Sequence, residues 1–257
     1  MQYVINKGIA GLGNRLQSLG WALDTALKHD AKLVVDWEDS TWRLGFNDFF
    51  SLDGIDIAPL SEVPDDIDVS PETWRDKWMH RCGTKQGGKA MTYRIEPDAE
   101  AQVICVYKHA HSDELSRRIR PSPASQETIA ANLNMMPSFN AYHIRNTDKQ
   151  TSDWQEWIEE ATNRQNVSKQ PSLIATDSIE VEAAARDAGL VCVSWLIPPD
   201  AKGGVHHARC NDETKDAINL SAVVDMWLCV HAETFTACCP SSTFSQFVER
   251  MRKVKER

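Results

Sequence analysis

The sequence predicts an α/β protein built from two Rossmann-like domains that face each other across a cleft. Three observations support this fold class. A glycine-rich turn joins a strand to a helix near the N-terminus, strand and helix patterns alternate through residues 141–251, and 257 residues suffice for two small domains. Parallel sheets bind ligands beyond the carboxyl ends of their strands, so we expect the ligand in the cleft.

The first predicted domain covers residues 1–130 and begins with a βαβ unit. Leucine and alanine recur at helical spacing between two short apolar runs, whereas residues 37–100 have weak periodicity and predict loops and short elements. Pro121 and Pro123 flank a polar stretch that we take as part of the linker region. The expected elements are strands at residues 3–5, 33–36 and 103–107, and a helix that follows the glycine turn and ends near His29.

The second predicted domain covers residues 131–257 and continues the alternation of strand and helix. Ser152 and Gln155 have capping-box spacing, so Ser152 is expected to begin a helix. Gly189 is expected to follow the end of the next helix, because glycine readily takes a left-handed conformation. A Pro/Gly-rich segment at residues 198–209 predicts a loop beside the cleft. The expected strands are at residues 141–145, 173–175, 190–193 and 235–238, and the expected helices begin at Ser152, Asp177 and Ser241 and include residues 217–231.

Composition excludes several classes of protein. Hydrophobic residues make up 42% of the chain and charged residues 25%, as in an ordinary globular protein. No window approaches the ~20 apolar residues of a membrane helix, and the N-terminal residues lack the pattern of a secretion signal. The net charge of −9 makes nucleic acid and anionic membranes poor partners, so an anionic ligand needs a local group of Arg, Lys and backbone N–H.

The seven cysteines predict reduced core residues of a cytoplasmic protein. The chain has no C-x-x-C pair, and Cys105, Cys192, Cys229 and Cys238 lie in apolar segments. Two His and one Cys occur within residues 206–210, but no second ligand pair at zinc-finger spacing accompanies them. We therefore expect no metal site.

The glycine-rich turn leaves two interpretations open. Gly11 and Gly13 precede a helix whose N-terminus attracts anions, and glycine permits close approach of the backbone to a phosphate. An NAD-binding turn would carry a third glycine where this chain has Leu16, although Asp36 lies where such a turn needs a ribose-binding acid. The alternatives are an NAD-dependent oxidoreductase and a tight strand-to-helix turn without a ligand.

Polar groups follow three strands of the second predicted domain. Arg145 ends the first of them, with Lys149 nearby, and its planar guanidinium suits a diphosphate, although a solvated loop is the alternative. Asp177 follows the next strand, where a ligand role and a helix N-cap are both open. Ser241 and Ser242 open the last helix, where hydroxyl and N–H groups suit a phosphate or serve as an ordinary cap.

These motifs, in this order, resemble those of the α1,6/α1,2/protein O-fucosyltransferase superfamily. The motifs are residues 143–149 (HIRNTDK), 174–177 (IATD), and 224–225 (VD) with 240–242 (PSS), and the turn at 11–16 (GLGNRL) is similar to the N-terminal turn of these enzymes. The similarity is strongest to the α1,6 branch, which includes the bacterial nodulation fucosyltransferases. The resemblance implies a GT-B fold, GDP-fucose as donor, a glycan or peptide hydroxyl as acceptor, inversion at the anomeric carbon, and no required metal or cofactor.

The resemblance also implies roles for single residues. Arg145 would bind the donor diphosphate, and Asp177 and Asp225 would help to hold the nucleoside. Asp153, ten residues after His143, matches the carboxylate proposed as the base in α1,6 enzymes. The implied catalytic residues are Asp153, Lys149 and Arg145, and the implied donor-binding residues are His143, Arg145, Asp177, Asp225, Ser241, Ser242, Gly11, Gly13, Asn14 and Arg15. The first predicted domain would lie on the acceptor side and the second would bind the nucleotide sugar.

Two departures from the family pattern keep a second hypothesis open. Asn146 stands where many α1,6 members carry a second Arg, and the base position holds Asp rather than Glu. A non-catalytic GDP-sugar-binding protein of the same fold is therefore the alternative to an enzyme. If Ser152 caps its helix, Asp153 lies in the first turn, where the helix dipole favours an ionised carboxylate. Asp153 is then either the base or a residue that only complements the dipole.

Overall fold

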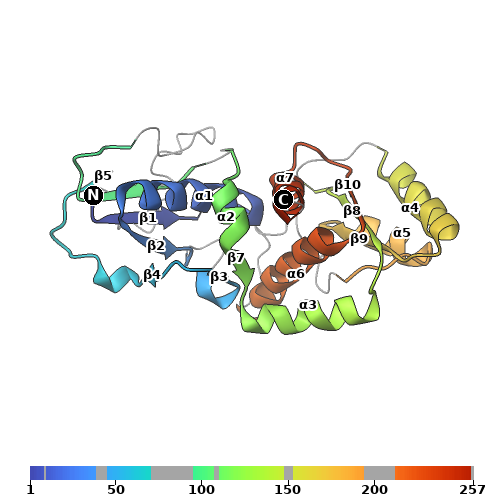
Figure 1. Ribbon diagram of the computed structural model, residues 1–257. Coiled ribbons are helices and arrows are strands. Elements are labelled where there is room, and N and C mark those ends of the chain that lie inside the picture. The colour runs from blue at the N-terminus through green and yellow to red at the C-terminus, as the bar shows by residue number, and fades with distance from the viewer. Residues whose placement is uncertain are drawn as a thin grey trace. The chain divides into compact units, whose positions relative to one another are not determined.

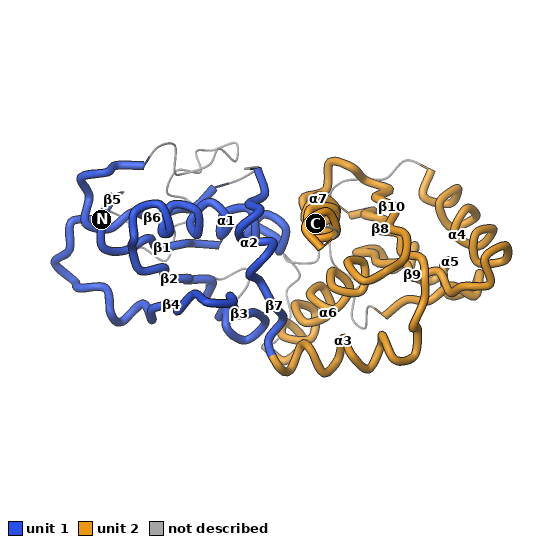
Figure 2. The backbone as a smooth tube through the Cα atoms, in the orientation of Figure 1, with its two compact units in different colours: residues 1–122, 257 blue, residues 123–256 orange. Residues whose placement is uncertain are grey.

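The chain forms two compact units in the computed structural model, which describes residues 1–8, 10–38, 45–70, 95–106, 110–147, 153–193 and 212–255. Unit 1 spans residues 1–122 and unit 2 spans residues 123–256 (Figure 2). The division falls at the start of helix α3 (Pro123–Met135). This helix runs through residue 130, where the sequence predicts the boundary between the two domains.

A five-stranded parallel sheet forms the centre of unit 1 (Figure 1). Strand β1 (Tyr3–Lys7) lies between β2 (Lys32–Asp36) and β6 (Ala101–Ile104), and every residue of β1 is buried. The register pairs Tyr3 with both Lys32 and Ala101, so β6 begins earlier than the strand predicted at residues 103–107. The strand order is β4 (Ile57–Ala58), β2 (Lys32–Asp36), β1 (Tyr3–Lys7), β6 (Ala101–Ile104) and β5 (Val69–Ser70).

Helix α1 (Leu12–His29) follows β1 and precedes β2, which confirms the predicted βαβ unit. Its leucines Leu16, Leu19 and Leu23 are fully buried, as their helical spacing predicts. The helix ends at Asp30, which takes a left-handed conformation with φ of 49° and donates its backbone N–H to the last turn.

Short elements occupy the described part of residues 37–100, as weak periodicity predicts. They include η1 (Phe46–Asp48), β3 (Phe50–Leu52) and η2 (Leu60–Glu62), and β3 pairs antiparallel with β7 (Ile119–Pro121). The fully buried Trp37 packs edge-on against Phe46 and Phe50, with ring centroids 5.2 and 6.1 Å apart. Aromatic packing rather than long regular elements therefore holds this region.

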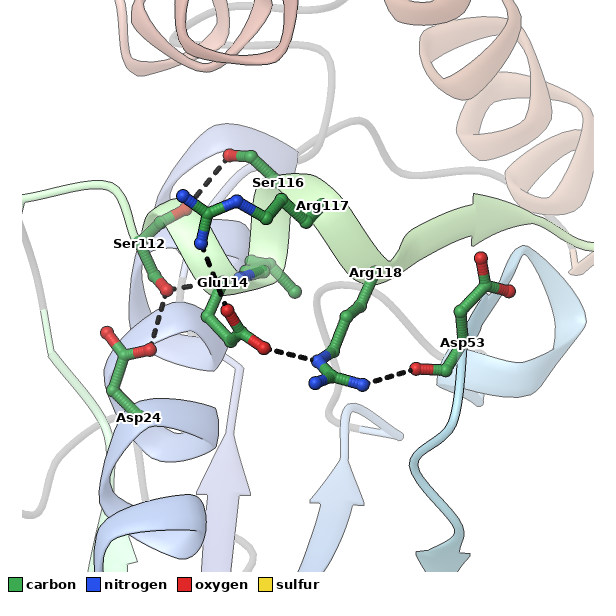
Figure 3. A network of polar contacts seen from close by, with 8 residues as sticks. Asp24, Asp53, Ser112, Glu114, Ser116, Arg117 and Arg118 are labelled. Atoms are coloured by element: carbon green, nitrogen blue, oxygen red, sulfur yellow. Dashed lines mark hydrogen bonds and ion pairs between the residues drawn. The ribbon is translucent and has the colours of Figure 1, made fainter. Parts of the chain in front are cut away.

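Side-chain hydrogen bonds tie helix α2 (Asp113–Arg118) to its neighbours in unit 1 (Figure 3). Ser112 precedes α2 and donates to the Asp24 carboxylate of α1 over 2.7 Å. Arg118 donates to Glu114 over 2.6 Å and to the backbone carbonyl of Asp53 over 2.9 Å. The short helix is thus fixed to α1 and to the segment after β3.

Unit 2 contains a three-stranded parallel sheet. Its order is β10 (Thr234–Ala237), β8 (Asn140–Ile144) and β9 (Ser172–Thr176). The strand predicted at residues 190–193 is reduced to a single parallel bridge between Val191 and Leu173. Val191 makes both of its backbone hydrogen bonds there, to Ser172 and Ile174, so the bridge extends the sheet beyond β9 without a regular strand.

Helices pack against the sheet of unit 2, and their apolar side chains form part of its core. Gly189 has a φ of 74° and follows the end of α5, as predicted. Arg252 of α7 donates to backbone carbonyls at the end of α6, including that of Ala232. Within the described ranges, no helix is long and apolar enough to cross a membrane. The remaining helices are α4 (Trp154–Ser168), α5 (Ile179–Asp187), α6 (Asp212–His231) and α7 (Thr243–Lys255).

Candidate functional site

The carboxyl ends of the unit 2 strands bring several predicted site residues to one edge of the sheet. Because β8, β9 and β10 are parallel, the residues that follow them share that edge. Ile144 pairs with Thr176, so Arg145 and Asp177 are the next residues along neighbouring strands. The sequence motifs that contain these two residues are thus adjacent in space.

Asp177 holds the segment that follows β8. Its Oδ1 accepts the backbone N–H of Asn146 over 2.9 Å, and its Oδ2 accepts the hydroxyl of Thr147 over 2.6 Å. Oδ2 also lies 3.6 Å from Nε of Arg145. Helix α5 is capped instead by Ser178, whose hydroxyl accepts the N–H of Val181 over 3.4 Å. The N-cap interpretation of Asp177 is therefore wrong.

His143 connects β8 to the start of α7. Its Nδ1 lies 2.7 Å from the Ser245 hydroxyl, and its ring stacks on Phe244 with a centroid distance of 4.4 Å. Burial, and secondarily the charge of Arg145, lower the pKa of His143 to about 3. The imidazole is thus neutral at physiological pH, and it fixes α7 beside the segment that carries Arg145.

The start of α7 combines a helix N-terminus with a buried hydroxyl. Helix α7 begins at Thr243, so Ser241 and Ser242 immediately precede it, as predicted. Ser242 is fully buried, and its Oγ has no hydrogen-bond partner among the described residues. Ser241 is exposed, and its hydroxyl lies 3.6 Å from Sγ of Cys239. A helix N-terminus with an unused hydroxyl suits an anion.

Asp225 lies on α6 in the interior of unit 2, where its side chain is buried. Burial, followed by the negative charge of Asp225, raises the pKa of the Cys229 thiol well above its usual value. Burial likewise raises the pKa values of Cys192 and Cys238 to about 12. These thiols stay protonated and unreactive at neutral pH. The prediction of reduced core cysteines is confirmed for them and for Cys105, all of which are free and buried.

Asp153 takes a position different from the one predicted. Helix α4 begins at Trp154, and Asp153 is its N-cap residue, with a φ of 65° and no side-chain hydrogen bond to the helix. The prediction that Asp153 lies inside the first turn is therefore wrong by one residue. Its carboxylate is exposed and takes no part in capping. Ser152 and Lys149 lie outside the described residues.

The glycine turn of unit 1 lies at the corresponding edge of its own sheet. Gly11 is the N-cap residue of α1 with a φ of −77°, and Gly13 lies in the first turn. The left-handed conformation falls instead on Ala10, with a φ of 57°. The Oδ1 atom of Asn14 is buried and has no hydrogen-bond partner among the described residues. Asn14 is thus the member of this turn with an unused polar atom.

Arg15 is fully buried, and its guanidinium contacts unit 1 itself. Its Nε donates to the carbonyl of Ala10 over 3.0 Å, and its Cζ lies 5.8 Å from the ring centroid of Trp37. A Cβ at Gly8 would lie 1.9 Å from Nη1 of Arg15, so only glycine leaves room for this side chain. Arg15 would have to give up these internal contacts to bind a donor, so they oppose the donor-binding role predicted for it.

A cluster of polar side chains at the carboxyl edge of the unit 1 sheet was missed by the sequence analysis. Lys7 at the end of β1 forms an ion pair with Asp36 at the end of β2, and both side chains are largely buried. Asn6 accepts from Nε1 of Trp37 over 2.8 Å and donates to Ser18 over 2.9 Å. Asn6 and Lys7 are polar residues at the end of a buried strand, which is the signal that could have pointed to this cluster.

The structure shows no metal-binding cluster in the part of the chain that it describes. The His/Cys run at residues 206–210 and the predicted loop at residues 198–209 lie outside the described residues.

Several solved structures have the same fold as this chain. A NodZ α-1,6-fucosyltransferase soaked with GDP-fucose matches 97% of this chain and 92% of its own, with a TM-score of 0.66 at 17% identity. Fucosyltransferase NodZ from Bradyrhizobium matches 96% and 92% of the two chains, with a TM-score of 0.67 at 16% identity. POFUT1 in complex with GDP matches 98% and 94%, with a TM-score of 0.58 at 14% identity.

This chain has the fold of these fucosyltransferases. The resemblance and the GT-B-like α/β fold that the motifs predict are confirmed at the level of fold. No protein-family model matches the chain, and no curated protein matches its sequence. At 12–17% identity, the likeness concerns the fold and leaves the reaction to be argued from the site.

Proposed function

We propose that this chain is an inverting, metal-independent glycosyltransferase that moves fucose from GDP-fucose to a hydroxyl group of a glycan or peptide. The observation that carries the proposal is the contact of β8 with the start of α7 through His143, two residues before Arg145. His143 contacts Phe244 and Ser245 of α7, and Arg145 follows His143 by two residues. A guanidinium beside a helix N-terminus is suited to a diphosphate.

The proposed reaction is a single displacement at the anomeric carbon. The acceptor oxygen forms a bond to that carbon while the bond between the carbon and the diphosphate oxygen breaks. The proton of the acceptor hydroxyl passes to the Asp153 carboxylate, and the electron pair of the broken bond stays on the departing GDP. Arg145, Lys149 and the N–H groups around Ser242 would stabilise the charge on the diphosphate.

Removal of the Arg145 guanidinium tests the donor site. In Arg145→Ala we expect GDP affinity, measured by calorimetry, to fall below detection, because loss of one partner of a close charge pair commonly costs about 2–5 kcal/mol. Circular dichroism should show an unchanged fold. Arg164→Ala is the matched control, since Arg164 lies exposed on α4 and should leave GDP binding as it is. Equal affinity of Arg145→Ala and the parent would place the donor elsewhere.

Turnover separates this proposal from its alternatives. GDP-fucose at a hundredfold excess over its dissociation constant should stabilise the fold by about 2.7 kcal/mol, and a suitable acceptor should release GDP. Tight binding without turnover across a broad acceptor panel would instead indicate a non-catalytic GDP-sugar-binding protein. Saturable NADH binding would indicate an oxidoreductase, although Lys7 already pairs with the Asp36 carboxylate that ribose would need.

A further inference from the structure

We propose that Asp177 is a positioning residue, which orients the Arg145 guanidinium toward the donor diphosphate by holding residues 145–147 and does not itself touch the nucleoside. This inference rests on the proposed function for the identity of the ligand. It differs from the role that the sequence motif implies, in which Asp177 helps to hold the nucleoside.

The contacts of Asp177 all lead to the segment after β8. One carboxylate oxygen accepts from the backbone of Asn146 over 2.9 Å, and the other accepts from the hydroxyl of Thr147 over 2.6 Å. Hydrogen bonds to a charged acceptor are stronger than neutral ones, and two of them on consecutive residues fix both backbone and side chain. The segment therefore has one preferred conformation while the carboxylate is present.

The same carboxylate faces Arg145. Its Oδ2 lies 3.6 Å from Nε, and the side chains of Asp177 and Arg145 are only 18% and 19% exposed, so the charges are only partly screened by solvent. An ion pair at Nε restricts the orientations that the guanidinium plane can take. Because a planar guanidinium recognises phosphate in specific orientations, this constraint lowers the cost of ordering Arg145 when a diphosphate binds.

Asp177 is available for this task because it does not cap helix α5. Ser178 provides the cap, so the Asp177 side chain can reach across to the neighbouring strand end. The parallel register explains the reach, since Ile144 and Thr176 are paired and the next residues lie side by side. Both oxygens are turned to residues 145–147, and their two hydrogen bonds occupy about half of the roughly four acceptor sites of the carboxylate.

The test compares Asp177→Asn and Thr147→Val with the parent in three measurements. The first is hydrogen exchange at the backbone N–H of Asn146, and the others are the dissociation constants of GDP and of guanosine. In Asp177→Asn we expect faster exchange at Asn146 and GDP affinity reduced roughly tenfold to a hundredfold, with guanosine affinity unchanged. Thr147→Val should change GDP affinity in the same direction by a smaller factor. Thr162→Val is its control, because the Thr162 hydroxyl bonds only within α4.

A direct nucleoside contact would give another pattern. Guanosine and GDP would then lose affinity by the same factor in Asp177→Asn, exchange at Asn146 would stay slow, and Thr147→Val would bind GDP like the parent. That result would overturn the inference. If the parent binds no GDP, the proposed function fails, and exchange at Asn146 still decides whether Asp177 holds the segment. If Asp177→Asn does not fold, Thr147→Val decides through the same measurements.

Discussion

Asp153 combines an uncommon backbone conformation with an uncommitted carboxylate. Its φ of 65° lies in the left-handed region, where Asp and Asn are the side-chain-bearing residues best tolerated. The side chain makes no capping hydrogen bond to α4 and is exposed. The fold does not use this carboxylate for capping, so it is available for the role of base in the proposed reaction.

Asp153→Asn tests that role without disturbing the backbone, because Asn suits the same left-handed conformation. If Asp153 is the base, transfer should fall by roughly 10²–10⁴-fold, measured as kcat, while GDP affinity barely changes. Glu156→Gln is the matched control, since Glu156 lies exposed in the first turn of the same helix. Retained transfer in Asp153→Asn would assign the proton to another carboxylate or to the departing diphosphate.

His143 predicts a pH dependence of stability with a definite sign. Its pKa is lowered to about 3 by burial and then by Arg145, so the unfolded chain takes up a proton at higher pH than the folded chain does. His143 is therefore neutral in both states above its ordinary pKa of 6.5. As pH falls from 6.5 toward 3, the folded state loses up to about 1.4 kcal/mol per pH unit relative to the unfolded state.

His143→Gln removes the titration and keeps an amide that can bond to Ser245. We expect the melting temperature of the parent to fall more steeply between pH 7 and pH 5 than that of the variant. Groups that titrate in both proteins cancel in the comparison. Parallel melting curves would mean that His143 is not buried as a neutral ring.

At the scale of elements, α2 depends on one serine with two tasks. Ser112 accepts the N–H of Leu115 over 3.1 Å as the cap and donates to Asp24 of α1 over 2.7 Å (Figure 3). The two helices approach closely at Gly20, where a Cβ would lie 2.8 Å from the Ser112 Cβ. The same hydroxyl thus caps the start of α2 and joins α2 to α1.

Ser112→Ala should lower the free energy of unfolding, measured in urea, by about 2 kcal/mol, of which about 1 is the lost cap. The other ~1 kcal/mol is the lost bond to the Asp24 carboxylate, which is less than a buried bond to a charged group contributes because Asp24 is exposed. Ser178→Ala is the comparison, because Ser178 caps α5 at 3.4 Å and should cost about 1 kcal/mol or less. Equal losses in the two variants would show that the bond to Asp24 contributes nothing.

At the scale of the whole molecule, two parallel sheets organise the chain (Figure 1). Each sheet collects polar groups at its carboxyl edge, Lys7 with Asp36 in unit 1 and Arg145 with Asp177 in unit 2. Because the net charge of the chain is −9, the proposed anionic donor would need such a local basic group. At each of these edges a basic side chain is paired with a carboxylate.

Most regular elements could be predicted from the sequence, because apolar periodicity reports burial directly. The leucines of α1 and the apolar runs of β8 and β9 are such cases, and the structure has all three elements. The start of α4 and the strand around Val191 could not be fixed, because capping and pairing depend on which partners the fold supplies. Element boundaries follow from hydrogen bonds that periodicity does not contain.

The sequence by itself determined the two-part α/β fold and the residues that gather at the edge of unit 2, because strand order along the chain sends successive motifs to the same sheet edge. Only the tertiary structure decided which partners the polar residues of the two units contact. Asp177 bonds to the segment after β8, His143 is a neutral contact to α7, and Arg15 is buried beside Trp37. The physical reason is that a polar side chain bonds to whichever partner burial leaves within reach, and that partner is set by packing between distant parts of the chain.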